Sequence, residues 1–309
     1  MIESENIIAD IPFLKGKQFV VEGNIYDNDM FPSCYKVSCE GNLYKLRLPS
    51  QINPNSVIKE AKALSILNKY KINNIPEIIY FDDTKKPNVS YLIETYHSGE
   101  SLDKIHSTLT LEDWDCISNN LLGFIISISQ IHNDCFESFD NTTKQYNNYG
   151  ELLSDRIKMH IKNSKDSGVL SLELVEQIIN SLYGIDKEFI NQPSFLHFDI
   201  KPKNIIYDVN NKTVTFIDFE HSRFGDLSHE LFRGNVAVIR NPYFGECWSY
   251  VTKKLNNEHN LFKSSKTNFY YQLFLLTSEL SFACSTKDTN MILNYIKRIH
   301  NLLQNKSLL

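Results

Sequence analysis

The chain has 309 residues, with 32 Lys and Arg against 37 Asp and Glu, so its formal net charge is -5. This acidic balance suits small cationic ligands and disfavours nucleic acid, because phosphate binding leaves a basic surface on a protein. Hydrophobic residues make up 42% of the chain, which excludes a disordered polymer. The most apolar stretch, residues 121–131, is too short for a membrane span of about 20 residues, and the acidic start lacks a signal peptide's basic region. We therefore expect a folded cytoplasmic protein that acts away from membranes.

The first part of the chain, up to residue 96, is rich in predicted strands. One helix interrupts them after Asn55, since Val57, Ala61 and Leu64 recur at helical spacing. The predicted order is β-β-β-α-β-β. The strands, where β-branched and aromatic residues gather or alternate with polar ones, are expected at residues 17–22, 33–38, 42–48, 75–81 and 89–94.

From residue 97 onward, helical periodicity dominates the sequence. A short hairpin interrupts the helices, because residues 204–208 and 213–218 alternate like strands on either side of a turn. This change of character predicts an α+β protein with a β-rich lobe at residues 1–96 and a larger helical lobe at residues 97–309. A cleft between two such lobes is a common place for a ligand. The helices are expected at residues 111–132, about 150–162, 171–191 and much of 226–304.

The predicted hairpin brings polar residues together at its open end. Antiparallel pairing about its turn requires the residue numbers of facing pairs to add up to about 421 or 422. The numbers of Asn204 and Asp218 add up to 422, so these side chains should face each other. A carboxylate and an amide oxygen form an all-oxygen site that suits Mg²⁺ sharing phosphate oxygens.

Asp199 lies on the loop that enters the same end of the hairpin. At this place it would accept a hydrogen bond from an attacking hydroxyl, and a metal site beside such a base is what phosphoryl transfer requires. The alternative is an ordinary hairpin in which Asp199, Asn204 and Asp218 serve as turn and cap residues. The second aspartate, at a hairpin-consistent spacing after an apolar strand, favours the catalytic interpretation.

Two segments, His197-Phe-Asp-Ile-Lys-Pro-Lys-Asn204 and Ile217-Asp-Phe-Glu220, resemble the catalytic and metal-binding loops of kinase-fold enzymes. Arg223-Phe-Gly-Asp226 and Ser129-Gln-Ile-His132 are similar to segments of the aminoglycoside phosphotransferase and choline kinase family in particular. The metal motif reads Asp-Phe-Glu where protein kinases have Asp-Phe-Gly, and no Ala-Pro-Glu segment follows it. The resemblance implies a bilobal protein-kinase-like fold and an Mg²⁺-dependent small-molecule kinase that uses ATP or GTP.

The resemblance also implies roles for single residues. Asp199 matches the catalytic base, and Asn204 and Asp218 match the metal ligands. The sequence departs from the family at two positions, since Phe198 stands where Gly is usual and Lys201 where His is common. A lysine at this position resembles the protein-kinase loop, in which it contacts the γ-phosphate, so the same role is expected of Lys201.

In the small lobe, Tyr44-Lys-Leu-Arg-Leu48 resembles the strand whose cation holds the α- and β-phosphates. Arg47 takes that position, and Lys45 is the reserve because it lies on the same face of the strand. The following helix resembles the family's helix and places Glu60 as the carboxylate that braces the cation.

Two further segments are implied to hold the nucleotide. Glu94-Thr-Tyr96 resembles the hinge whose backbone bonds a purine, which makes Glu94 and Tyr96 cofactor-binding candidates. The phosphate loop is expected at residues 23–32, where a single glycine stands.

The acceptor is the least defined part of the expected reaction. An aminoglycoside-type antibiotic is a polycation and would need a carboxylate-lined pocket, for which the candidates are Glu220, Asp226, Glu230, Glu246 and Glu279. A choline kinase would need an aromatic box, which residues 243–250 could supply, and sugar and nucleoside kinases are further alternatives. A catalytically silent nucleotide-binding regulator is the alternative from another class, which the intact polar residues of the two loops disfavour.

Overall fold

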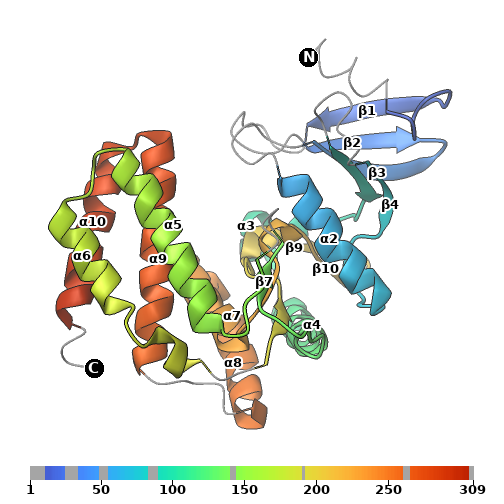
Figure 1. Cartoon of the computed structure of the whole chain (residues 1–309). Helices are drawn as coiled ribbons and strands as arrows, with labels where there is room; N and C mark the ends of the chain where they lie inside the picture. Colours follow the sequence, from blue (N-terminus) through green and yellow to red (C-terminus); the bar gives the residue numbers. More distant parts are fainter. Residues whose placement is uncertain are drawn as a thin grey trace.

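The computed structural model describes residues 11–24, 34–48, 55–82, 90–139, 144–189, 192–259 and 265–305. The predicted α+β architecture is confirmed, with a β-sheet and one helix in the N-terminal part and mainly helices in the C-terminal part (Figure 1). The predicted order of elements in the N-terminal part, β-β-β-α-β-β, is also confirmed.

The N-terminal sheet is antiparallel, with strand order β1-β2-β3-β5-β4 in the described residues. On β3 the side chains alternate, so that Leu46 packs into the apolar core while Lys45 and Arg47 are buried on the opposite face. The strand expected from residue 75 begins only at Ile78, because Pro76 has no amide proton for a strand ladder. The strands span Phe19–Asn24 (β1), Cys34–Cys39 (β2), Asn42–Arg47 (β3), Ile78–Asp82 (β4) and Tyr91–Thr95 (β5).

Helix α2 (Ser56–Lys69) joins the sheet to the rest of the molecule. Its apolar stripe, which includes Val57, Ala61 and Leu64, enters a core shared with residues of the C-terminal part. The helix also packs against the 3-10 helix Phe219–His221, which follows the hairpin. Glu60 lies on the buried side of α2 with no exposed surface, so its carboxylate requires a cation from a neighbouring element.

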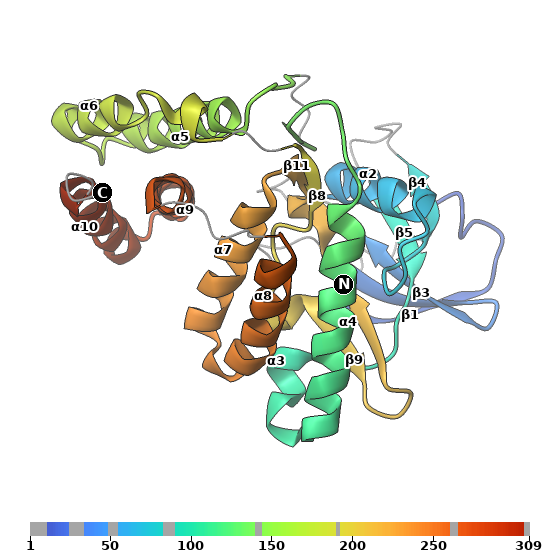
Figure 2. The same cartoon turned by 90° about the horizontal axis from the view of Figure 1, so that it is seen from below.

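The C-terminal helices form two groups (Figures 1 and 2). Helices α4, α7 and α8 pack near the hairpin, whereas α5, α6, α9 and α10 form a separate layer. The helix expected over residues 171–191 ends at Ser181, because Gly184 adopts a left-handed conformation with φ +75 and a 3-10 helix follows it. None of the described helices has the length and apolar character needed to cross a membrane. The helices span Leu102–Ile105 (α3), Leu111–Ser129 (α4), Tyr149–Asp166 (α5), Leu172–Ser181 (α6), Leu227–Arg240 (α7), Gly245–His259 (α8), Ser265–Thr286 (α9) and Thr289–Asn305 (α10).

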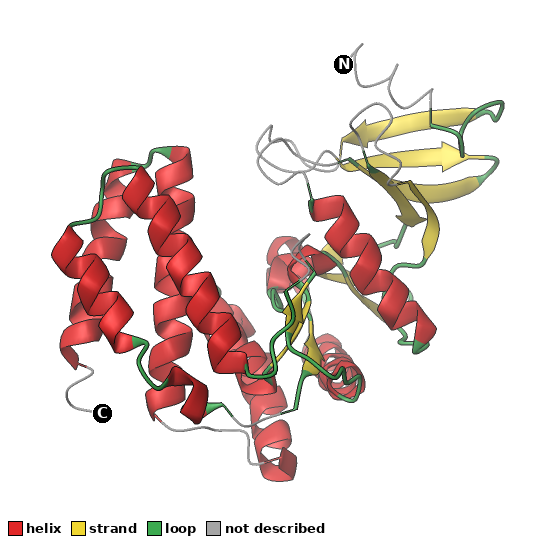
Figure 3. Ribbon diagram, in the orientation of Figure 1, coloured by secondary structure: helices red, strands yellow, loops and turns green. Residues whose placement is uncertain are grey.

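The predicted hairpin is present as β9 (Ile205–Asp208) and β10 (Thr213–Phe216), drawn in yellow in Figure 3. Its register pairs Phe216 with Ile205, so facing residue numbers add up to 421. Asn204 is therefore opposite Ile217, whose amide donates to the Asn204 carbonyl (3.1 Å). The prediction that Asn204 faces Asp218 is thus wrong by one residue, because Asp218 is the next residue along the chain. Short strands that the sequence did not predict span Glu100–Ser101 (β6), Glu137–Ser138 (β7), Ser194–Leu196 (β8) and Arg223–Gly225 (β11).

Helix α7 packs closely against α8 at Gly234, where there is no room for a side chain. A Cβ atom at Gly234 would lie 1.9 Å from Cζ2 of the buried Trp248. We expect Gly234→Ala to destabilise the fold by about 1–3 kcal/mol through overpacking. Gly123→Ala in α4 is the matched control, since its Cβ would meet nothing within 4 Å and a helical alanine is favoured over glycine by about 0.5–1 kcal/mol. Urea denaturation of both variants measures the difference, and equal stabilities would contradict the packing argument.

Candidate active site

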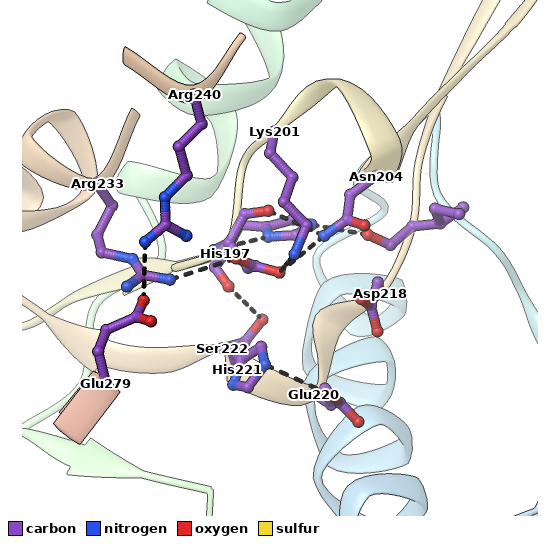
Figure 4. Close-up of polar contacts among 12 residues, drawn as sticks. His197, Lys201, Asn204, Asp218, Glu220, His221, Ser222, Arg233, Arg240 and Glu279 are labelled. Carbon is purple, nitrogen blue, oxygen red and sulfur yellow. Dashed lines mark hydrogen bonds and ion pairs between the residues drawn. The ribbon is translucent and has the colours of Figure 1, made fainter. Parts of the chain in front are cut away.

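The loop between β8 and the hairpin presents the carboxylate of Asp199 between several polar donors, of which Lys201, Asn204 and Arg233 are labelled in Figure 4. Its Oδ2 atom accepts hydrogen bonds from Lys201 Nζ (2.6 Å) and Asn204 Nδ2 (3.0 Å), and its Oδ1 atom accepts one from Arg233 Nη2 (3.3 Å). Burial raises the pKa of Asp199, but the charges of Lys201, His221 and Arg233 outweigh it and hold the pKa below its ordinary value. The carboxylate is therefore ionised, as a group that accepts a proton must be.

His197 holds the backbone of this loop. Its Nδ1 atom accepts a hydrogen bond from the Asp199 amide (3.3 Å), so its Nε2–H donates to the Ile217 carbonyl (3.0 Å). Burial lowers the pKa of this imidazole, so the ring stays neutral. His197 thus connects the Asp199 loop to the end of the hairpin, which is a structural role.

The side-chain oxygen of Asn204 accepts no hydrogen bond from the described residues. Its side-chain nitrogen donates to the Asp199 carbonyl (2.9 Å) and carboxylate, which fixes the orientation of the amide. Its Oδ1 atom is buried and has no hydrogen-bond partner within the part of the chain that the structure describes. A buried amide oxygen without a donor is costly unless a cation or another ligand meets it. This orphaned oxygen fits a metal ligand.

Asp218 follows the hairpin in a left-handed conformation with φ +70. Burial raises the pKa of its carboxyl group, but Arg47, His221 and Lys201 together hold the pKa well below its ordinary value. No cluster of three His, Cys, Asp or Glu side chains with metal-binding geometry occurs among the described residues. A cation held by Asn204 and Asp218 would thus take its remaining ligands from water and phosphate, as Mg²⁺ commonly does.

Arg47 links the two parts of the site. Its guanidinium group pairs with Glu60 of α2, with Asp218 (3.1 Å) and with Glu220 (2.6 Å). The side chain is only 3% exposed, so these three carboxylates surround a buried cation. The contact between Arg47 and Glu60 is the one that the sequence analysis expects, whereas the pairing with Glu220 was not predicted.

Lys45 occupies a different position from Arg47 on the same face of β3. Its Nζ atom pairs with Glu94 Oε1 of β5 at 2.6 Å. Burial lowers the pKa of this lysine, but Glu94 and its neighbours outweigh it and keep the group charged. The pair forms one wall of a cavity of about 250 Å³.

That cavity lies beside the metal candidates. Strand β5 and its continuation contribute Glu94 and Tyr96, and the hairpin contributes Ile206 and Ile217 as an apolar surface. The amide of Tyr96 already donates to the Leu43 carbonyl (3.4 Å), so a purine in the cavity would bond to other backbone groups than this amide. Most of the expected phosphate loop, residues 25–32, lies outside the described residues.

Two expected acceptor residues are in the interior and do not line a pocket for substrate. Asp226 is fully buried and caps α7 by accepting a hydrogen bond from the Ser228 amide (2.9 Å). Glu230 is fully buried too, and its Oε2 atom accepts a hydrogen bond from the Phe198 amide (2.8 Å). The four-residue spacing puts both on one helix face, and that face packs inward. Of the other candidates, Glu220 borders a cavity, where its carboxylate is paired with Arg47. Glu246 lines another cavity, and Glu279 accepts a hydrogen bond from Arg240.

Phe198 explains why glycine is usual at its position. Its φ is +67, a conformation that costs most side chains energy and costs glycine none. The hydrogen bond from its amide to Glu230 holds this conformation, and the Arg223 guanidinium lies 3.7 Å from the centre of its ring. Arg223 and Arg233 were not predicted as site residues. Arg233 follows Glu230 by three residues, and this helical spacing is the signal that could have placed it near the loop.

Fold and site together define a kinase-like phosphotransferase. A family model described as "Phosphotransferase enzyme family" (APH) matches residues 35–241, and the chain belongs to this family. No curated protein matches the chain.

Solved structures of low sequence identity share the fold. Aminoglycoside phosphotransferase APH(4)-Ia has 16% identity and a TM-score of 0.66, with 98% of this chain and 99% of that chain covered. A putative fructosamine-3-kinase from Haemophilus somnus 129PT has 15% identity and a TM-score of 0.70, with 98% of each chain covered. The GDP and kanamycin complex of APH(2")-IIia has 16% identity and a TM-score of 0.61, with 98% of this chain and 99% of that chain covered. The predicted protein-kinase-like fold is thus confirmed.

The buried carboxyl group of Glu230 makes stability depend on pH. Burial raises its pKa to about 7, while the Phe198 amide and Arg233 lower it. Because the folded pKa exceeds the unfolded value of about 4.3, the contribution of this group is complete below that value and is lost as pH rises to about 7. We expect Glu230→Gln, which keeps an acceptor for the Phe198 amide, to gain on the order of 1–3 kcal/mol of stability relative to wild type between pH 5 and pH 8. Urea denaturation at both pH values measures this change, and a constant difference would contradict it.

Proposed function

We propose that this protein transfers the γ-phosphate of ATP or GTP to a hydroxyl group of a small molecule, with Mg²⁺ as cofactor. The observation that carries the proposal is the pairing of an ionised, multiply bonded Asp199 with the orphaned Oδ1 atom of Asn204 directly beside it. A proton acceptor and an unused oxygen ligand at one loop end are what in-line phosphoryl transfer needs from a protein. An ordinary turn would have no reason to leave this buried oxygen without a donor.

In the proposed reaction, Asp199 orients the acceptor hydroxyl and takes its proton while the oxygen bonds to phosphorus. Lys201 and Arg233 keep the carboxylate ionised and in place through their contacts with its two oxygens. Asn204 and Asp218 would hold Mg²⁺, which neutralises phosphate charge when it is bound. Because the Lys201 ammonium group contacts the Asp199 carboxylate, it would also lie near the phosphoryl group that is transferred there.

The cavity lined by Lys45, Glu94 and Tyr96 is the proposed nucleotide site, with residues 1–96 as the nucleotide-binding lobe and residues 97–309 as the catalytic and acceptor-binding lobe. Structural neighbours bound to ADP, AMP-PNP and GDP support a nucleotide donor. Lys45 lines the cavity, whereas Arg47 is surrounded by carboxylates. We therefore propose that Lys45 binds the nucleotide phosphates. Arg47, which pairs with Glu60, would instead hold the Asp218 carboxylate in position.

The acceptor expected from the family resemblance, an aminoglycoside, needs a pocket lined by several carboxylates. The burial of Asp226 and Glu230 removes two of its five candidates. A choline site in the 243–250 region is also disfavoured, because Phe244 and Trp248 are core residues. We therefore propose the reaction class, with a sugar or nucleoside kinase as the alternative to an aminoglycoside kinase.

Replacement of the base tests the reaction. We expect Asp199→Asn to lower kcat by at least about a hundredfold, because the amide cannot accept the hydroxyl proton. Nucleotide affinity, measured by calorimetry, should change little, since Asp199 does not line the nucleotide cavity. Asp166→Asn, at the exposed end of α5, makes the same charge change outside the site and should keep full turnover. Equal loss of turnover and nucleotide binding in Asp199→Asn would contradict the role of Asp199 as base.

Replacement of the orphaned amide tests the metal site. We expect Asn204→Ala to raise the Mg²⁺ concentration needed for half-maximal nucleotide binding by about tenfold or more, because one of two protein ligands is lost. Titration of nucleotide binding against Mg²⁺ by calorimetry measures this shift without turnover. Asn210→Ala in the exposed hairpin turn is the control. An unchanged Mg²⁺ requirement in Asn204→Ala would remove Asn204 from the metal site.

A further inference from the structure

A cavity of about 380 Å³ lies between α4 and α8, two helices that pack side by side (Figure 2). Cavities of this size are typical of small-molecule sites. This cavity shares no lining residue with the nucleotide cavity, and no residue of the Asp199 loop is among its described lining residues. Helix α4 contributes Leu111, Trp114, Asp115, Ser118 and Asn119 to the lining, and α8 with the 3-10 helix before it contributes Tyr243, Glu246, Cys247 and Tyr250.

The cavity lies toward the turn of the β9–β10 hairpin, whereas the catalytic loop lies at the open end of the hairpin. Asp113, which directly precedes Trp114 on α4, pairs with Lys212 in that turn. The candidate metal ligands flank the other end of the two strands. A molecule in this cavity would therefore stay away from Asp199 and would not be the acceptor of the phosphoryl group. The site goes beyond the proposed phosphotransferase function.

Three aromatic side chains, Trp114, Tyr243 and Tyr250, line the cavity from both sides. Trp114 and Tyr243 are half-buried and pack against the core beneath them. The Tyr250 hydroxyl donates a hydrogen bond to Asn119 Oδ1 at 2.7 Å, which ties this residue to α4. Packing and hydrogen bonding thus hold the three rings in place. The face of an aromatic ring carries partial negative charge and attracts cations.

Both charged residues of the described lining are negative. Asp115 on α4 and Glu246 on α8 are exposed carboxylates. Neither side chain forms an ion pair or a hydrogen bond within the part of the chain that the structure describes. No lysine, arginine or histidine is among the described lining residues. A ligand in this cavity would therefore meet two carboxylates that no described cation neutralises by contact.

Two basic side chains contact the rings without lining the cavity. His106 stacks on Tyr243, with ring centres 3.8 Å apart. The Lys254 ammonium group lies 5.9 Å from the centre of the Tyr250 ring, at the outer limit of about 6 Å for a cation–π contact. Neither basic residue belongs to the lining, so the two carboxylates remain available to a ligand.

We propose that this cavity binds a small organic cation, an amine or a quaternary ammonium compound, with its apolar part between the three rings and its charge toward Asp115 and Glu246. The ring faces and the two carboxylates attract the same positive charge. A neutral molecule of the same shape would gain the apolar contact alone. An anion would meet two carboxylates with no counter-charge in the described lining, which disfavours it.

The two tryptophans of the chain give a direct readout of binding. Trp114 lines the cavity, whereas Trp248 is buried and donates to Asn235 Oδ1 at 2.9 Å. NMR spectra of the whole chain with ¹⁵N-labelled tryptophan show both indole N–H signals, and Trp114→Phe assigns them. The probes are cyclohexylammonium, cyclohexyltrimethylammonium, cyclohexanol and cyclohexanecarboxylate, at neutral pH and equal ionic strength.

We expect one or both cations to shift the Trp114 signal with a Kd at least about fivefold lower than that of cyclohexanol, as a cation–π contact contributes. The signal of the buried Trp248 should move less. The primary and the trimethylated cation distinguish an amine from a quaternary ammonium ligand. Equal or tighter binding of cyclohexanol or of the carboxylate, or no shift of the Trp114 signal with either cation, would overturn the proposal.

Glu246→Gln locates the charge preference in this cavity. We expect it to weaken cation binding by about threefold or more, as an exposed ion pair contributes, and to leave cyclohexanol binding unchanged. Glu112→Gln is the matched control, because it removes one negative charge from an exposed position of α4 outside the lining. Equal weakening by the two variants would show a general charge effect and would overturn the assigned site.

Tyr250→Leu tests the aromatic part of the site. Leucine keeps an apolar contact but has no ring face, so we expect the two cations to lose more affinity than cyclohexanol does. Tyr183→Leu, at a position that is 91% exposed and outside this cavity, is the control and should leave all four affinities unchanged. An equal loss for cations and cyclohexanol in Tyr250→Leu would overturn the role of the ring in charge recognition.

The same titration in Asp199→Asn separates this site from the proposed reaction. None of these measurements uses turnover, so their outcome does not depend on phosphoryl transfer. We expect unchanged cation binding in Asp199→Asn, because Asp199 does not line the cavity. Loss of cation binding in this variant would place the cation at the catalytic loop and would overturn the assigned site.

Discussion

One buried cation, Arg47, ties the parts of this molecule together. Its partners are Glu60 on α2 and Asp218 and Glu220 after the hairpin, so one guanidinium joins β3 to both of these segments. Burial lowers the pKa of Arg47, but the three carboxylates raise it well above its ordinary value, so the charge persists. Removing one member of such a buried cluster leaves an uncompensated charge, which is why these contacts constrain the position of α2 relative to the metal motif.

The same cluster connects ligand binding to the small lobe. Asp218 is both a partner of Arg47 and a candidate metal ligand, so a cation at Asp218 competes with the guanidinium for the carboxylate. Any weakening of that contact acts on Glu60, because Arg47 holds both. A metal ion held by Asp218 would therefore act, through Arg47 and Glu60, on the position of α2.

The sequence predicts those features that depend on local pattern. Alternation and turn residues are enough for the order of strands and for the hairpin, and the motif spacing is enough to bring Asp199 to Asn204. Features set by packing were missed. Asp226 and Glu230 lie on one face of α7, but only the contacts of that helix with the catalytic loop and α8 decide that this face is buried. Arg223 reaches the site through a three-residue strand too short to predict.

A net charge of -5 does not predict the charge of a ligand. A bound molecule responds to charges within a few ångströms, since exposed charges farther away than about 10 Å are screened by salt. Lys59, Arg156 and Arg223 come from three separate elements, and only the fold brings them with Glu220 to the lining of one cavity. Asp199, Asn204 and Asp218 lie on the loop and at the end of the hairpin, whereas these charged side chains come from α2, α5, β11 and the 3-10 helix Phe219–His221. A local motif can therefore indicate the reaction class, but the charges around a bound molecule are decided by packing.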